Sequence, residues 1–165
     1  MPNQNDPPPP AWGEILRLEL LFEESPRGEA FADLVRTSKW GHKIREAVLK
    51  PLIHRREPAA IEDAILFLEV SPRFPGSGYH KRALTAALKS ANLTPQQVAR
   101  LRQVVLDAAE SPRIGPEFSE YARLAVRLAD REFIWVIQTR QAEAAGWKKD
   151  RLERILRLWR VHGRG

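Results

Sequence analysis

Apolar side chains recur at intervals of three and four positions along most of this chain, from Trp12 to Val161. That interval places them on one face of an α-helix, whereas a half-buried strand alternates at every second residue. Prolines and glycines interrupt the pattern, because proline has no amide hydrogen to donate and excludes its predecessor from the helix. The pattern predicts an all-α fold of about nine helices joined by short loops. These helices are expected to begin near residues 12, 28, 41, 58, 79, 94, 118, 130 and 147.

One stretch is rich in residues that favour strands. Residues 133–137 read Phe-Ile-Trp-Val-Ile, which are aromatic and β-branched types. Helical patterns lie on both sides of it, and a single strand has no partner for its backbone hydrogen bonds. We therefore predict that this stretch belongs to the most buried helix of the fold. The tryptophans of the chain are expected to pack beside apolar stripes, and they are Trp12, Trp40, Trp135, Trp147 and Trp159.

Local signals mark where one helix starts and where another faces solvent. Thr94 can cap a first turn with its hydroxyl oxygen, and Pro95 suits the first helical position. Gln97 stands where the reciprocal partner of a capping box belongs. On the helix expected from residue 58 onward, Glu62 and Asp63 are expected to mark the exposed face.

The phrase Ser-Pro-Arg occurs three times, and each copy follows a helical pattern. Its prolines, Pro26, Pro72 and Pro112, are 46 and 40 residues apart. Each copy is expected to end a structural unit, because proline forces the preceding serine out of the helical conformation. Units of this length closed by proline turns resemble HEAT-type α-solenoids, over residues 12–145. The resemblance implies a short right-handed solenoid of antiparallel helices, and a compact helical bundle is the alternative architecture.

Length and composition favour one globular domain. We expect a disordered proline-rich tail at residues 1–11 and a single helical domain over residues 12–165. The chain has no cysteine, and its four histidines lack a metal-binding spacing, so we predict no disulfide, metal, cofactor or catalytic residue. No apolar run reaches the roughly 18 residues that span a bilayer, and the start of the chain is unlike a secretory signal. These features favour a cytoplasmic protein and leave its oligomeric state open.

Positive charge gathers in the second half of the chain. Residues 1–80 carry a net charge of −2, and residues 81–165 carry a net charge of +8. A basic helix is expected at residues 147–162, and its apolar stripe consists of Leu152, Ile155, Leu156 and Trp159. The residues of this helix that are predicted to contact a partner are Lys148, Lys149, Arg151, Arg154, Arg157 and Arg160. Arginine suits carboxylates and phosphates because its planar fork makes paired hydrogen bonds, although a capping helix with a merely solvated face is the alternative.

A second candidate site lies at residues 75–82, where glycines precede the start of a helix. Backbone amides at such a start point outward and can bind a phosphate group. The predicted phosphate contacts are Ser77, Lys81 and Arg82. The Gly-Lys-Ser/Thr ending of a P-loop is absent, and the alternative is a flexible loop in which Ser77 caps the helix.

These features together predict a non-enzymatic helical interaction module that docks on a larger macromolecular partner through its basic C-terminal half. An acidic protein surface is the favoured partner, because the positive charge is moderate and the other half of the chain is acidic. Binding to the phosphate backbone of a nucleic acid, as a free protein or as a ribonucleoprotein subunit, is the second hypothesis. The HEAT-like resemblance adds a third, an enzyme of the DNA glycosylase type, whose signature does not map onto these residues.

Overall fold

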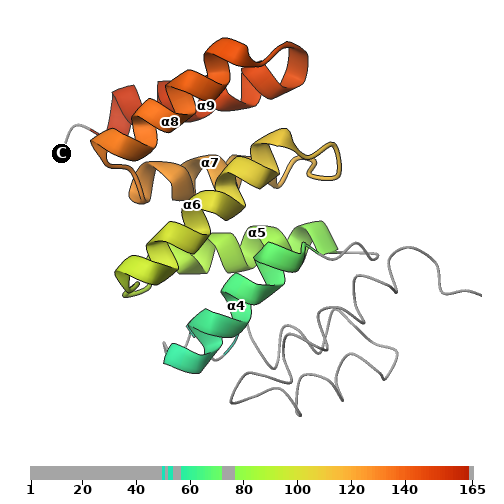
Figure 1. Cartoon of the computed structure of the whole chain (residues 1–165). Coiled ribbons are helices and arrows are strands. Elements are labelled where there is room, and N and C mark those ends of the chain that lie inside the picture. Colours follow the sequence, from blue (N-terminus) through green and yellow to red (C-terminus); the bar gives the residue numbers. More distant parts are fainter. Residues whose placement is uncertain (1–49, 51, 54–56, 72–76, 164–165) are drawn as a thin grey trace, which may run out of the picture. The chain divides into compact units, whose positions relative to one another are not determined.

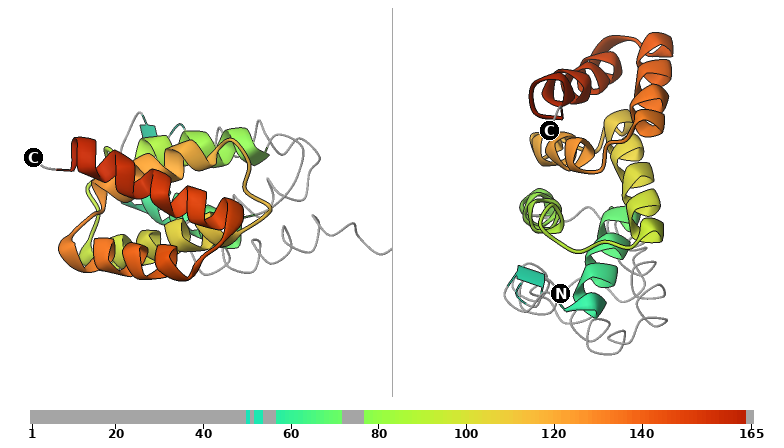
Figure 2. Two further views of the ribbon diagram at one scale, coloured as in Figure 1. Left: turned by 90° about the horizontal axis from the view of Figure 1, so that it is seen from above. Right: turned by 90° about the vertical axis from the view of Figure 1, so that its left-hand side faces the viewer.

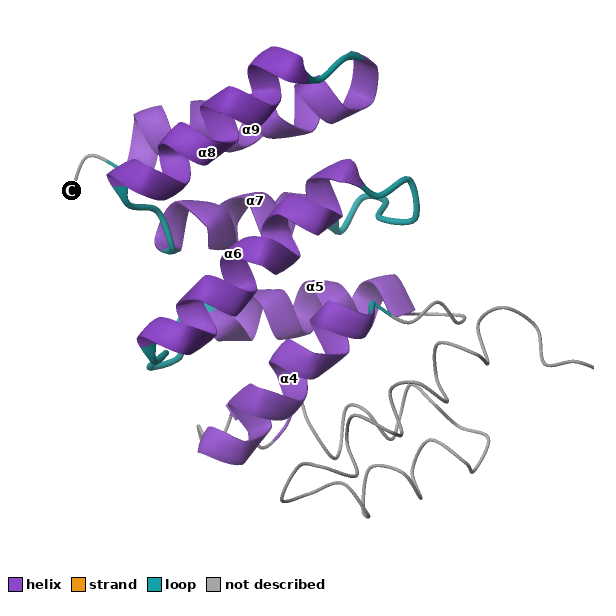
Figure 3. Cartoon of the chain, viewed as in Figure 1, coloured by secondary structure: helices purple, strands orange, loops and turns teal. Residues whose placement is uncertain are grey.

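The computed structural model describes residues 50, 52–53, 57–71 and 77–163 (Figure 1). Over these residues the protein is all-α, with helices joined by loops and no strand (Figure 3). The six helices described are α4 (Pro58–Val70), α5 (Ser77–Leu88), α6 (Pro95–Glu110), α7 (Phe118–Arg127), α8 (Arg131–Glu143) and α9 (Gly146–His162). The fold class is confirmed, and the described helices number six rather than about nine. The helices predicted near residues 12 and 28 lie outside the described residues, as do the predicted tail and the first Ser-Pro-Arg, and of the helix predicted from residue 41 only residues 50, 52 and 53 are described.

The chain divides into two compact units, Met1–His80 and Lys81–Gly165. In the N-terminal unit, α4 buries an apolar stripe at helical spacing, which consists of Ile61, Ala64, Ile65 and Leu68. Asp63 is also buried, with 1% of its surface exposed, so the prediction that it marks an exposed face is wrong. Asp63 lies about one helical turn before the buried Phe67, so these two residues share a buried side of α4 next to the apolar stripe. The single domain over residues 12–165 stays a prediction.

The third Ser-Pro-Arg and the serine of the second stand directly after a helix, and Pro72 and Arg73 lie outside the described residues. α4 ends at Val70 and α6 ends at Glu110, so Ser71 and Ser111 each follow the last helical residue. Ser111 is extended, as a following proline favours, whereas Ser71 adopts a left-handed conformation with φ of 50°. Neither serine continues the helix, and Ser111 confirms the phrase as a helix stop at the third copy.

The helices of the C-terminal unit lie in two layers (Figure 2). α7 and α9 lie in one layer with the part of α5 that starts at Lys81, and α6 and α8 lie in the other. α9 packs against α7, α8 and α6, and α6 also packs against α7. The core of this unit is mainly aliphatic, and its fully buried members include Leu84, Leu88, Leu101, Val105, Leu124, Ile137, Leu152 and Ile155. α9 is thus anchored along one side by this core, and its other side stays at the surface.

The capping box predicted at the start of α6 is present. The hydroxyl oxygen of Thr94 accepts a hydrogen bond from the amide of Gln97 at 3.2 Å. The side-chain oxygen of Gln97 accepts in return from the amide of Thr94 at 2.9 Å, and Pro95 occupies the first turn. Two amides that have no partner within the helix are therefore satisfied locally.

We expect Thr94→Ala to lower the free energy of unfolding by about 1 kcal/mol, because it removes one cap and leaves the amide of Gln97 without an acceptor. Urea denaturation followed by far-ultraviolet circular dichroism measures this loss. Thr139→Ala is the matched control, since the Thr139 hydroxyl is exposed and donates only to the carbonyl of Trp135 within α8. Equal effects of the two substitutions would contradict a specific role for the capping box.

α8 is not the most buried helix, contrary to the prediction for residues 133–137. It buries Phe133, Ile134 and Ile137, but Trp135 is 64% exposed. Position 135 lies about 200° around the helix from position 133, so burying one side turns Trp135 outward. Trp147 is 42% exposed, so two of the tryptophans expected to pack beside apolar stripes lie largely at the surface.

Candidate functional site

The basic residues of α9 do not form one surface. The helix buries Leu152, Ile155 and Leu156, as predicted for its apolar stripe. Four arginines recur at every third position from Arg151 to Arg160. Three residues turn an α-helix by about 300°, so each arginine lies about 60° behind the one before it. The four guanidinium groups therefore spread over half of the helix circumference and meet different surroundings.

Arg151 is half-buried, and its guanidinium group is used inside the protein. It donates to the carbonyl oxygens of Ala108 at 3.0 Å and of Ser111 at 2.7 Å, and also to that of Ile114. Its guanidinium carbon lies 4.6 Å from the ring centre of Trp147 and 5.0 Å from that of Phe118. Burial lowers the pKa of Arg151, and the nearby charge of Glu117 opposes this shift.

These contacts give Arg151 a structural role. Ala108 belongs to the last turn of α6, and Ser111 and Ile114 belong to the loop that leads to α7. One guanidinium group thus holds that loop against α9. The expectation that Arg151 faces a partner does not agree with this arrangement.

The other predicted contacts near the ends of α9 differ in how far their charge is balanced. Arg160 donates to the carboxylate of Glu153 at 3.1 Å, which balances its charge locally. The ammonium group of Lys148 lies 5.7 Å from the ring centre of Trp147. Lys149 is exposed. A site for an outside partner is therefore expected in the middle of the helix.

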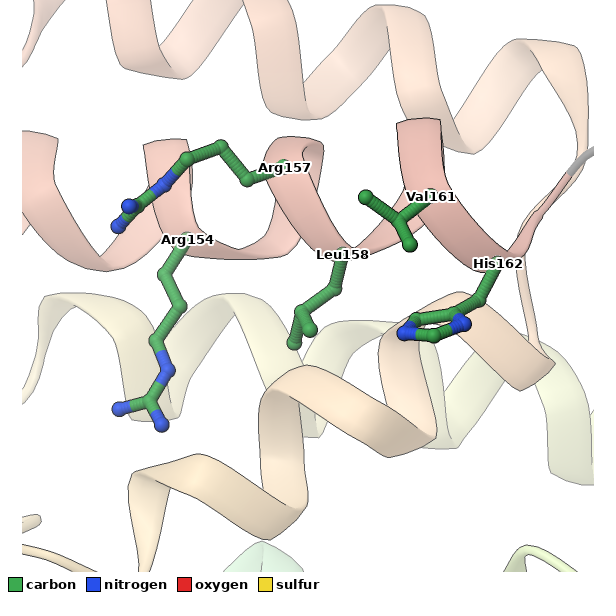
Figure 4. Close-up of a pocket in the computed structure, with 5 residues that line it drawn as sticks. All are labelled: Arg154, Arg157, Leu158, Val161 and His162. Atoms are coloured by element: carbon green, nitrogen blue, oxygen red, sulfur yellow. The ribbon is translucent and has the colours of Figure 1, made fainter.

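Arg154 and Arg157 are exposed, and neither has an acidic partner among the described residues. They border a hollow of about 240 Å³ that is also lined by Leu158, Val161 and His162 (Figure 4). These five positions have the spacing of a single helical face. In Figure 4, Arg154, Leu158 and His162 extend from α9 toward α7, and Arg157 runs along α9 toward its N-terminal end.

A second hollow of about 370 Å³ adjoins the first and carries it across to α7. It shares Leu158 and His162 with the first, and α7 adds Arg123 and Val126 to its lining. We call these two hollows together the basic groove. The seven residues that line it are Arg123, Val126, Arg154, Arg157, Leu158, Val161 and His162.

Arg123 lines the groove, and its charge is balanced by a carboxylate of the same chain. Its guanidinium group donates to the carboxylate of Glu120, which also accepts from the ammonium group of Lys89 at 2.9 Å. Burial raises the pKa of Glu120, but hydrogen bonds and charge from Lys89 and then from Arg123 outweigh it, so this pKa lies below its ordinary value. The side chain of Arg123 remains 56% exposed and can still reach a partner at the edge of the groove.

Two of the three residues predicted to bind a phosphate within residues 75–82 are buried. Ser77 is 7% exposed and Lys81 is 2% exposed, whereas Arg82 is exposed. Ser77 and Lys81 stand four residues apart on α5, and Leu88 follows seven residues after Lys81 on the same buried face. The ammonium group of Lys81 is therefore withheld from an external phosphate, and only Arg82 of the three stays accessible. Residues 75 and 76 lie outside the described residues.

Sequence reasoning found Arg154 and Arg157 but missed the other residues of the groove. A signal for them was present, because Arg154, Leu158 and His162 stand four residues apart along α9. The many arginines of α9 obscure this spacing, because the aliphatic and imidazole side chains of the groove stand between them. Arg123 and Val126 join the groove only through the packing of α7 on α9.

Among the described residues, no group of three or more histidine, aspartate or glutamate side chains is placed to hold a metal ion. None of the described helices has the length and apolar character needed to cross a lipid bilayer. No protein family, curated protein or solved structure matches this chain.

Proposed function

We propose that this protein is a non-enzymatic cytoplasmic interaction module that binds an acidic segment of a larger protein in its basic groove. One observation carries the proposal: Arg154 and Arg157 are exposed beside the groove without an acidic partner among the described residues. Other arginines of α9 have partners within the protein: Arg151 donates to backbone carbonyls, and Arg160 donates to a carboxylate. The two arginines at the groove are instead oriented for carboxylates from outside.

The lining of the groove favours a protein partner over a nucleic acid. Leu158, Val161 and Val126 place aliphatic side chains between the cationic groups. Surfaces that bind single strands combine cations with aromatic rings on which bases stack, and no aromatic ring other than the imidazole of His162 lines the groove. The exposed Trp135 belongs to α8, in the other layer of helices. The groove also contains no carboxylate or tryptophan with which to capture a flipped base, which argues against the glycosylase hypothesis.

We also propose that the protein is a short HEAT-like right-handed solenoid, which presents the groove on one layer of its helices. The alternation of α6 and α8 with α7 and α9 between two layers supports it. Repeat proteins of this kind commonly bind partners along one layer of helices, and the basic groove lies on such a layer.

The proposal is tested with the double variant Arg154→Gln and Arg157→Gln. We expect the wild-type chain to bind members of a fluorescein-labelled acidic peptide library at low salt, and the double variant to bind them about tenfold more weakly. The matched control is the double variant Arg131→Gln and Lys149→Gln, which removes the same charge from exposed positions outside the groove. Fluorescence polarisation measures all three proteins.

Two results would contradict the proposal. Equal losses in both double variants would show that only net charge attracts the peptides. Tighter binding to a mixed-sequence DNA duplex, with an affinity that falls by a log–log slope of about −0.9 for each phosphate contact as salt is added, would favour the nucleic-acid hypothesis instead.

A further inference from the structure

We infer that the middle of the basic groove is an anchor site for one apolar side chain of an acidic amphipathic helix. This inference rests on the proposed function and specifies the partner of the same site. Leu158 is half-buried at the centre of the groove, and both hollows share it. Val161 is 73% exposed beside it. A partner's apolar side chain would cover both.

The volume of the groove suits a side chain. The hollows measure about 240 and 370 Å³, near the lower limit of the roughly 300–1,000 Å³ typical of small-molecule sites. Their linings combine three aliphatic side chains with cationic and imidazole groups. A pocket of this size with a mixed lining accommodates a leucine-sized anchor and has charges ready for the residues on either side of it.

The order of side chains along α9 specifies the pattern of the partner. Arg154, Leu158 and His162 follow one another at four-residue intervals, about one helical turn apart. Leu158 lies between the guanidinium group of Arg154 and the imidazole ring of His162 in Figure 4. A helix laid along this row matches it when it carries an acidic, an apolar and a second acidic residue, each one turn after the last. Charge complementarity therefore selects an acidic amphipathic helix as the occupant.

The test uses the full chain and three labelled alanine-based peptides of about 16 residues, a length that sustains a helix. The first peptide carries glutamate, leucine and glutamate at four-residue intervals. The second has serine in place of the leucine, and the third has the composition of the first in scrambled order. We expect the first peptide to bind about tenfold more tightly than either of the others.

Variants of the protein locate the contact. Leu158→Ser is expected to weaken the first peptide about tenfold and to leave the second unchanged, because only the first has an anchor to lose. Val161→Ser is the second variant, since its side chain is 73% exposed and its replacement leaves the core intact. It is expected to act in the same direction with a smaller fold-change.

Each failure has a distinct meaning. Equal binding of the leucine and serine peptides overturns the anchor site but leaves the proposed acidic partner standing. Binding of a mixed-sequence DNA duplex with no binding of any peptide overturns both. Sedimentation that shows self-association of the wild type, abolished by Leu158→Ser, assigns the groove to a contact between copies of this chain and also overturns the anchor proposal.

Discussion

Replacing Arg151 with alanine is expected to lower the free energy of unfolding by about 3 kcal/mol. The guanidinium group donates to three backbone carbonyls, and after truncation those of Ala108 and Ser111 keep only backbone amide donors at 3.4 Å, while that of Ile114 loses its guanidinium donor. A hydrogen bond from a charged donor contributes about 1.5–3 kcal/mol, and the lost stacking on Phe118 and Trp147 adds to the effect. Water can replace part of what is lost, because the site is only half-buried.

The measurement is urea denaturation followed by far-ultraviolet circular dichroism, with Arg154→Ala as the matched control. Arg154 is exposed on the same helix and has no acidic partner among the described residues, so its truncation is expected to change the free energy of unfolding by less than about 0.5 kcal/mol. Arg151→Lys is expected to fall between the two, because one ammonium group cannot reproduce the planar fork. A loss of less than about 1 kcal/mol for Arg151→Ala would contradict the role of Arg151 in holding the loop.

The parts of the fold that the sequence predicts correctly are those decided by neighbouring residues. α6 ends at Glu110 because the ring of Pro112 acts on the residue just before it, Ser111, and holds it extended. Thr94 and Gln97 cap α6 because both groups lie within one turn. Each of these effects is local, so reading a few residues is enough.

The errors concern which side of a helix is buried, and neighbouring elements decide that. Asp63 and Lys81 are ionisable residues that the tertiary structure buries, although their charge predicts exposure. Trp135 is apolar but exposed, because α8 is an outer helix and presents only one face to its neighbours. Composition predicts how much of a helix is buried on average, but it does not identify the individual residues.

The same distinction explains the candidate site. The basic character of α9 is visible in the sequence, but the use of each arginine is not. Arg151 binds carbonyls at the end of α6 and in the loop after it, about 40 residues earlier in the chain, and no local pattern predicts such a contact. Arg123 and Val126 reach the groove only because α7 packs on α9. A row of arginines at three-residue spacing should therefore be divided by angular position before it is treated as one surface.

Glu120→Gln is the second substitution with a large expected effect, a loss of about 2 kcal/mol in the free energy of unfolding at neutral pH. The side chain of Glu120 is 6% exposed, and its carboxylate accepts hydrogen bonds from Lys89 and Arg123. Glutamine has nearly the same size but no charge, so the ammonium group of Lys89 loses its counter-charge beside a buried amide. The partial exposure of the two cations, 28% for Lys89 and 56% for Arg123, keeps the loss below that of a fully buried pair.

The loss is expected to depend on pH in a defined direction. The pKa of Glu120 lies below its ordinary value, because Lys89 and Arg123 together outweigh the opposing effect of burial. A carboxylate with a lowered pKa in the folded state stabilises the fold above its unfolded pKa of about 4.3, and this contribution disappears as the pH falls through the folded pKa. The wild type and the Glu120→Gln variant should therefore differ most at neutral pH and converge in acid.

Urea denaturation at pH 7 and at about pH 3 measures this convergence. Glu110→Gln is the matched control, because Glu110 pairs with Arg140 at the surface, where both side chains are at least one-third exposed. Its effect is expected to stay below about 1 kcal/mol at both pH values. If Glu120→Gln lowers the free energy of unfolding as much in acid as at neutral pH, then Glu120 stabilises the fold through its shape rather than its charge. The binding experiment then separates the two roles of Arg123, since Glu120→Gln removes its internal partner while leaving every residue of the basic groove in place.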